Sequence, residues 1–182
     1  MAKVSAEEHA KVVPRASKSE KLIGLTKHKK QTTIEIGFGG LLGMKCTRID
    51  HDFCKWLVQN FDSDTSSLNV YGRQLRLTYK AVNVLLGIRS EGNDVQLTGS
   101  LDAYPNIYEE VGVVKGVIPL NQLRLYLTKT DGVEDEFQRK YELYVLGAML
   151  CPTTMAALSP SSIHVIKDVN GMRACNWGKL AL

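Results

Sequence analysis

The pattern of apolar and polar positions predicts an amphipathic helix in the first third of the chain. Four apolar residues fall at helical spacing on one face, namely Ile49, Phe53, Trp56 and Leu57. Thr47 is expected to be the N-cap, because its hydroxyl can accept a hydrogen bond from a backbone N–H of the first turn, with Asp50 three residues later. The segment is therefore predicted to be a core-forming helix of about three to four turns.

Alternating apolar residues then predict a β-hairpin, followed by a short helix. The alternating residues are Leu68, Val70, Leu75 and Leu77, with the turn at Gly72. Thr78 is expected to cap the next helix and Gly87 to end it, since glycine readily adopts a left-handed backbone. The side chains expected to face the core are Val82, Leu85 and Leu86.

The second half of the chain is predicted to be mainly helical. Residues 88–118 show no sustained period, so we expect an irregular excursion with at most a short strand at 111–114. Pro119 then opens a helix whose apolar stripe is Leu120, Leu123 and Leu127. The strongest helical periodicity covers 134–150 and stops before Pro152, and a last full helix is expected from Ser159 to Asn170.

These elements together predict a mainly α-helical module with a small β-hairpin. The chain ends on an uncapped apolar stretch, 180–182, which suggests a truncated part of a larger domain. Its 182 residues are 44% hydrophobic, and the longest apolar runs fall far short of the roughly 18 residues that a membrane span needs. Four cysteines without an apolar signal segment favour reduced thiols.

The positive charge is concentrated at the N-terminus. Residues 1–33 hold seven Lys and one Arg against three Glu, a net +5, whereas the whole chain is +4 and the remainder is therefore −1. We predict a disordered basic tail over 1–33 and a helical domain over 34–182. Within the tail, Lys27, Lys29 and Lys30 form the densest basic cluster, a candidate contact for nucleic acid or an acidic partner.

Exposed arginines on the hairpin form a second candidate contact. Arg73 and Arg76 lie on the predicted second strand and suit an acidic partner or a phosphate backbone. Trp56 and Trp177 are interpreted as core residues rather than ligand-stacking residues, because each follows the helical spacing of its apolar neighbours.

A glycine-rich stretch at 37–43 invites a phosphate-binding interpretation, which its spacing excludes. A Walker A loop needs a lysine directly after its last glycine, but Met44 separates Gly43 from Lys45. The dinucleotide fingerprint also fails, because Leu42 stands where its third glycine should be. We interpret the stretch as a close turn against the core, and we expect Gly40→Val to unfold the domain.

No catalytic or metal-binding residue is predicted. Cys46, His51 and Cys54 lie close in sequence, but they form none of the paired spacings typical of zinc sites. His164 could form a nucleophilic pair with Cys151 or Cys175, but only with an orienting residue and an oxyanion donor, which nothing in the sequence marks. We expect no cofactor, and we favour a non-enzymatic role while leaving enzyme activity open.

Several short motifs follow one another along the chain: IGFGGLLG, the CKWL helix, the GR hairpin, the LTYKAVNVLLGI helix, YVLGAMLCPTT and NWGKL. Their order resembles the plant mobile domain family, which is aminotransferase-like and transposon-associated, and the resemblance spans about residues 34–182. The chain departs from the family at "GIRSEGND", where relatives usually have a Gly-Leu-Pro turn. Some relatives carry a downstream ubiquitin-like (SUMO) protease domain. The resemblance implies a helical module in a nuclear, mobile-element-derived protein.

The leading hypothesis is therefore a non-catalytic module for protein or nucleic-acid association, with neither a membrane nor a small-molecule partner. The alternative is an accessory fragment of a ubiquitin-like-specific cysteine protease. A nuclear location is favoured over a cytoplasmic one.

Overall fold

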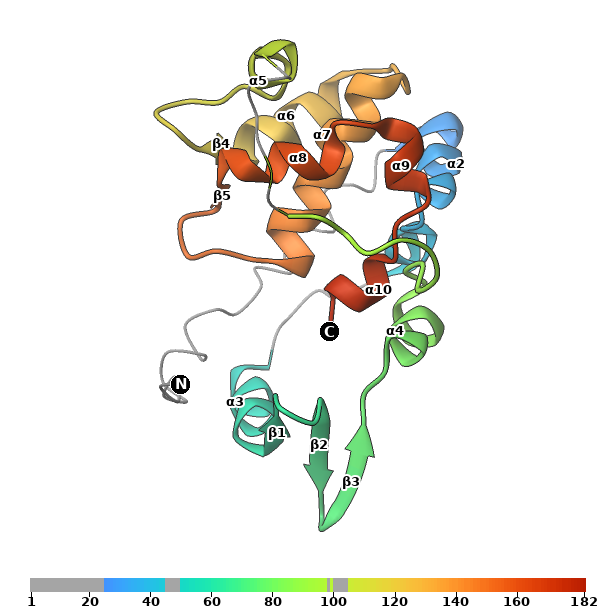
Figure 1. The fold of residues 1–182 in the computed structure, drawn as a ribbon, viewed down its shortest axis with the longest axis vertical. Coiled ribbons are helices and arrows are strands. Elements are labelled where there is room, and N and C mark those ends of the chain that lie inside the picture. The colour runs from blue at the N-terminus through green and yellow to red at the C-terminus, as the bar shows by residue number, and fades with distance from the viewer. Residues whose placement is uncertain (1–24, 45–49, 98, 100–104) are drawn as a thin grey trace.

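Helices dominate the computed structural model, which describes residues 25–44, 50–97, 99 and 105–182 (Figure 1). In chain order the helical elements are α2 (Lys27–Glu35), a 3₁₀ turn (Gly39–Gly43), α3 (His51–Asn60), α4 (Tyr79–Leu86), α5 (Pro105–Val111), α6 (Leu120–Lys129), α7 (Asp135–Val145), a π-helical turn (Leu146–Leu150), a 3₁₀ turn (Pro160–Ser162), α8 (Ile163–Ile166), α9 (Val169–Arg173) and α10 (Trp177–Leu180). The predicted mainly α class with a small β-hairpin is confirmed.

Two small antiparallel sheets accompany these helices. The three-stranded sheet has the order β1 (Phe61–Asp62), β2 (Ser67–Val70), β3 (Arg73–Arg76), and the two-stranded one pairs β4 (Ile118–Pro119) with β5 (Ala157–Leu158). The predicted hairpin is β2–β3, and its turn residues Tyr71 and Gly72 have φ of 49° and 79°. Two positive φ values are typical of the two-residue turns whose twist matches that of paired strands.

Helix α7 is the centre of the core. Acidic residues Asp135 and Glu136 occupy its first turn, and its second half is buried on every side. Helix α6 packs along it with the predicted stripe Leu120, Leu123 and Leu127, all buried. The helical path ends at Cys151, before Pro152, as predicted.

Residues 25–33 are part of this helical body, which corrects the predicted tail boundary at 33. Leu25 is buried, Thr26 caps α2, and the buried Thr33 lies against Tyr141 of α7. The buried polar side chains of Lys29 and Thr33 donate hydrogen bonds to carbonyl groups of the protein. Because these bonds replace the ones to water, the segment can be buried. Residues 1–24 of the predicted tail lie outside the described residues.

The glycine stretch lies against the end of α4, as the structural interpretation predicts. The Gly40 N–H donates to Gly87 O at 3.1 Å, and a Cβ on Gly40 would lie 2.1 Å from Leu86 O. Gly87 itself ends α4 with φ 60°, as predicted. Since backbone meets backbone, only glycine fits at this crossing.

The segment after Gly87 joins the glycine stretch to the C-terminal residues. Arg89 N–H donates to Gly37 O, and Gly178 N–H donates to Arg89 O, both at 2.8 Å. Trp177 is fully buried beside Phe38, with ring centroids 5.1 Å apart, so its predicted core role is confirmed. Three segments distant in sequence therefore share one junction.

Other sequence-based expectations need correction. Helix α3 begins at His51 with Asp50 as its N-cap, while Thr47 lies outside the described residues. Residues 105–111 of the expected excursion form helix α5, which packs against α7. The helix expected to run from Ser159 to Asn170 is broken at Asp168, whose side chain accepts a hydrogen bond from Asn170 N–H and caps α9.

Candidate partner-binding surface

The hairpin lobe, defined as residues 50–86, differs in burial from the rest of the described chain. All of its residues are described, and only Ser67 among them is buried. Of the thirteen large hydrophobic residues that are exposed in the described part of the chain, eight lie in this lobe, namely Phe53, Phe61, Tyr71, Leu75, Tyr79, Val84, Leu85 and Leu86. The prediction that α3 is core-forming is therefore wrong, as is the inward placement of Leu85 and Leu86.

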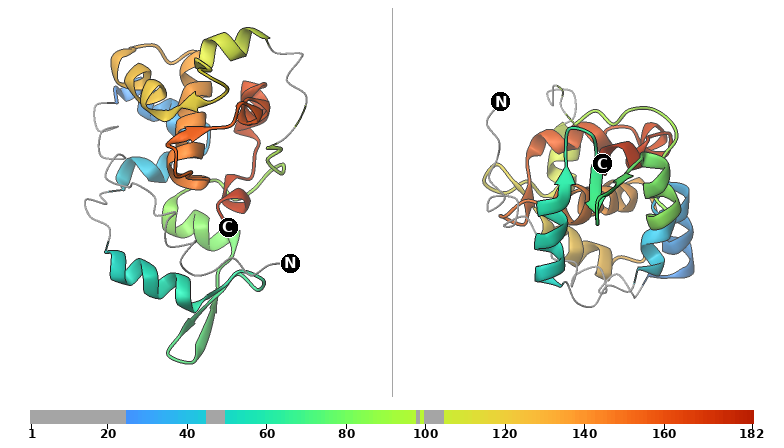
Figure 2. Two further views of the ribbon diagram at one scale, coloured as in Figure 1. Left: turned by 90° about the vertical axis from the view of Figure 1, so that its left-hand side faces the viewer. Right: turned by 90° about the horizontal axis from the view of Figure 1, so that it is seen from below.

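The lobe projects from the helical body at one end of the molecule (Figures 1 and 2). Helix α4 attaches it to α10, and α3 packs on β2. Local hydrogen bonds shape it: Asp50 accepts from Phe53 N–H at 2.9 Å, and Thr78 accepts from Ala81 N–H at 3.1 Å. Trp56, predicted to be a core residue, is only half-buried and stacks on Phe53.

The register of the small sheet separates an apolar face from a polar one. Phe61 pairs with Leu68 and Leu68 with Leu75, so these three side chains form one row across the strands. Asp62, Ser67 and Arg76 form the neighbouring row on the opposite face. Because successive side chains of a strand point to opposite faces of the sheet, Arg73 lies on the same face as Leu75, and Gln74 lies on the same face as Arg76.

The charges of the sheet are divided between its two edges. Residues 65–90 contain no Asp or Glu, and their basic residues are Arg73, Arg76, Lys80 and Arg89. Asp62 lies on the β1 edge, where the Thr65 hydroxyl and the Asp64 N–H donate to its carboxylate and lower its pKa. The β3 edge is therefore basic, and it combines guanidinium groups with exposed apolar side chains.

The predicted basic residues do not form one site. Arg73 and Arg76 are exposed on β3, whereas Lys27 and Lys30 are exposed on α2, which lies apart from the hairpin in Figure 1 and in the left view of Figure 2. Lys29 is a correction to the predicted partner-binding set, because its side chain is 3% exposed. Its ammonium donates to Leu127 O at 3.1 Å and to Thr130 O, which are carbonyls at the end of α6.

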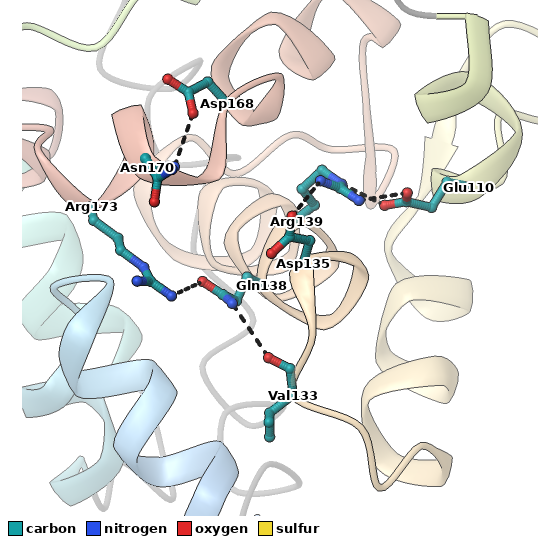
Figure 3. Close-up of polar contacts among 8 residues, drawn as sticks. All are labelled: Glu110, Val133, Asp135, Gln138, Arg139, Asp168, Asn170 and Arg173. Atoms are coloured by element: carbon teal, nitrogen blue, oxygen red, sulfur yellow. Dashed lines mark hydrogen bonds and ion pairs between the residues drawn. The ribbon is translucent and has the colours of Figure 1, made fainter.

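Two polar side chains of α7, Gln138 and Arg139, pair with groups of neighbouring elements. Arg139 donates to both carboxylate oxygens of Glu110, at 2.7 and 2.8 Å, and this pairing raises the pKa of Arg139 (Figure 3). Gln138 accepts from Arg173 at 2.9 Å and donates to Val133 O at 3.3 Å. These contacts join α5, α7 and α9, so they have a structural explanation.

A small pocket lies beside this network. It has a volume of about 70 Å³ and is lined in part by Glu110, Gln122, Tyr126 and Lys140. Lys140 already pairs with Glu136 at 2.6 Å and lies over the Tyr126 ring at 3.9 Å. The charged groups of the pocket therefore have partners within the chain.

Two of the described thiols, those of Cys151 and Cys175, lie where the nucleophilic thiolate is disfavoured. Burial raises the pKa of Cys151 and Cys175, which favours the neutral thiol over the nucleophilic thiolate. Cys46, the first of the three candidate ligands near α3, lies outside the described residues. Among the residues that are described, no group of three His, Cys, Asp or Glu side chains is placed to hold a metal ion.

The lobe's exposed apolar residues were missed by the periodicity argument, although one signal was present. Val82, Leu85 and Leu86 lie on one face of the helix Tyr79–Leu86, at i, i+3 and i+4, whereas Val84 lies on the other face. A helix of eight residues that contacts the body on one side must expose some of them.

Fold and surface together define a mainly helical protein that presents a basic and apolar hairpin lobe. A family model matches residues 18–182, and the chain belongs to that family, described as Domain of unknown function (DUF8566). No curated protein and no solved structure matches the chain. Within the described ranges, no helix has the length and apolar character needed to cross a bilayer.

Proposed function

We propose that this chain is a non-catalytic interaction module that binds an acidic protein or nucleic acid through its hairpin lobe. The observation that carries the proposal is the β3 edge, where Arg73 and Arg76 are exposed beside Leu75 on a stretch without acidic residues. Arginine suits this role because its planar guanidinium donates to carboxylates and phosphates with two parallel hydrogen bonds.

Exposed apolar area supports the same proposal. Tyr71 at the hairpin tip is 98% exposed, and Val84 and Leu85 on α4 are 83% and 76% exposed. Clusters of large apolar side chains on a protein surface are typical of contact sites, because a partner removes them from water. The half-buried thiols of Cys151 and Cys175, whose pKa is raised by burial, give no support to the cysteine-protease alternative.

The wider proposal places this module in a mobile-element-derived plant protein of the nucleus. Its support is the ordered set of motifs from IGFGGLLG to NWGKL. The basic cluster Lys27–Lys30 does not support the proposed nuclear location. A nuclear import signal must be accessible to its receptor, but this cluster is helical and Lys29 is buried.

Matched charge reversals test the binding surface. The Arg73→Glu/Arg76→Glu and Lys27→Glu/Lys30→Glu variants of the full chain lose the same charge at two separate predicted sites. Binding to fluorescent poly-glutamate and to a fluorescent single-stranded RNA would be measured by anisotropy at several salt concentrations. We expect the hairpin variant to lose affinity for the bound probe and the α2 variant to keep it. For RNA, loss of two phosphate contacts lowers the salt slope by about 1.4.

Two results would overturn this proposal. One is a wild-type chain that binds neither probe at low salt. The other is a hairpin variant that binds as well as wild type while its circular dichroism spectrum is unchanged. If only the α2 variant loses binding, the surface lies on α2 and the hairpin lobe is excluded.

A further inference from the structure

Among the described residues, no strand pairs with the outer edge of β3, and the register gives the positions of its outward backbone groups. Leu77 N–H donates to Ser66 O at 2.8 Å, and Val70 pairs with Arg73 across the two-residue turn. In an antiparallel ladder, residues that bond to the partner strand alternate with residues that point away from it. Arg73, Leu75 and Leu77 therefore bond to β2, whereas the N–H and C=O groups of Gln74 and Arg76 point outward.

Side chains around this edge could specify what binds there. Arg73 and Leu75 share the sheet face that carries Phe61 and Leu68, while Arg76 lies on the other face. An added strand would meet one guanidinium on each face, three residues apart. Between them it would meet Leu75, which is 55% exposed.

We propose, on the basis of the proposed function, that the partner is a protein whose extended acidic segment adds to the β3 edge as a fourth strand. The matching segment has an acidic residue opposite Arg76, an apolar residue opposite Leu75, any residue opposite Gln74 and an acidic residue opposite Arg73. Main-chain hydrogen bonds to Gln74 and Arg76 hold the segment, and its side chains set the specificity.

A polypeptide satisfies this edge more completely than a nucleic acid does. Phosphates would meet the two arginines, and a base would stack on Tyr71, but neither would satisfy the alternating donors and acceptors of Gln74 and Arg76. Leu75 would also remain in water. Arginines at an edge strand protect it from uncontrolled pairing with other chains, so the same residues can favour an acidic segment and repel a basic one.

Backbone and charge effects are separated by two substitutions at one position. Gln74→Pro removes the outward N–H, which β2 does not use, and Gln74→Thr keeps it. The probe is a capped ten-residue peptide of alternating threonine and valine with aspartate, leucine, threonine and glutamate at its centre. A control peptide has lysines in place of the two acids. Titration of the isotope-labelled full chain, followed by NMR, gives affinities and the amides that change.

We expect the acidic peptide to shift and protect the amides of Gln74 and Arg76, and Gln74→Pro to weaken its binding about ten-fold. Gln74→Thr should bind within about two-fold of wild type, and the lysine peptide should not bind. A peptide N-methylated on its edge-facing residues should also fail, and this measurement leaves the protein unaltered. Retained cross-strand contacts between residues 69 and 74 would show that the proline hairpin is intact.

Strand addition is overturned if the proline variant or the N-methylated peptide binds like its control. It is also overturned if only RNA binds at the arginines, or if the chain alone dimerises with protected edge amides. If the Gln74 variants bind alike but Arg73→Glu/Arg76→Glu does not bind, the proposed function stands and strand addition fails. If all of these variants bind like wild type, both fail.

Discussion

The helical body and the hairpin lobe are stabilised by different interactions. Every buried apolar residue of the described chain lies in the helical body, residues 25–44 and 88–182 as far as they are described, and none lies in residues 50–86. Local caps and the turn at 71–72 shape the lobe, and a three-stranded sheet this short is marginal without packing. The body's stability therefore comes from burial, and the lobe's exposed surface is available for a partner.

The largest expected effect breaks the junction between the two regions. Gly40→Val places a side chain 2.1 Å from Leu86 O, and the backbone of Gly87 cannot move without displacing α4. We expect a loss of more than about 4 kcal/mol, enough to unfold many domains. Gly43→Val is the matched control, because a Cβ there meets nothing within 4 Å. Thermal melts compare the two, and a cooperative wild-type melt for Gly40→Val would contradict the crossing.

Replacing one leucine in each region compares how much side-chain burial stabilises the helical body and the hairpin lobe. Leu143→Ala in α7 removes a fully buried side chain, and we expect a cost of about 2–5 kcal/mol from lost burial and the cavity left behind. Leu85→Ala in α4 removes one that is 76% exposed, and we expect a change within about 0.5 kcal/mol. Urea unfolding measures both. Similar losses at the two positions would show that the lobe buries Leu85 in solution.

Lys29 and Lys27 of α2 compare a buried lysine with an exposed one. Lys29→Met keeps the aliphatic stem but leaves two carbonyls at the end of α6 without their donor, at a cost of about 1–3 kcal/mol. Lys27→Met, on the exposed side of α2, should change the free energy of unfolding by less than about 0.5 kcal/mol. Chemical denaturation compares the pair. Equal free energies of unfolding for the two variants would show that the Lys29 side chain is exposed in solution, as that of Lys27 is.

The buried carboxyl group of Glu142 should make the stability of the helical body depend on pH. Its side chain is 1% exposed, both carboxylate oxygens lack a hydrogen-bond partner among the described residues, and burial raises its pKa well above the ordinary 4.5. Above pH 4.5 the unfolded chain releases this proton while the folded chain keeps it. The free energy of unfolding therefore falls as pH rises, by at most about 1.4 kcal/mol per pH unit, until the folded group also ionises.

Glu142→Gln should remove that slope, because the amide does not titrate. Unfolding free energies between pH 5 and 7 would be measured for both proteins. The wild type should lose stability relative to the variant as pH rises. A parallel pH dependence of the two proteins would mean that Glu142 is solvated or paired in solution. Spectroscopic probes of the hairpin lobe should not follow this titration.

Much of the local structure could be predicted because it depends on neighbours in sequence. Thr78 and Gly87 bound α4, Gly72 turns the hairpin, and the leucine stripe of α6 faces the core, as their spacing indicates. Helix α5 was missed because its seven residues have little periodic signal. The candidate surface was predicted only at Arg73 and Arg76, since periodicity cannot tell an apolar face that packs from one that stays exposed.

By itself the sequence determined the fold class, the positions of most turns and caps, and the mismatch between the glycine stretch and the two phosphate-binding motifs, because these depend on residue type and spacing. Tertiary structure decided which faces are buried. It placed Lys29 at the end of α6, Gly40 against Gly87, and Leu75 in solvent. Those outcomes depend on segments distant in sequence, and burial becomes defined only once the segments meet.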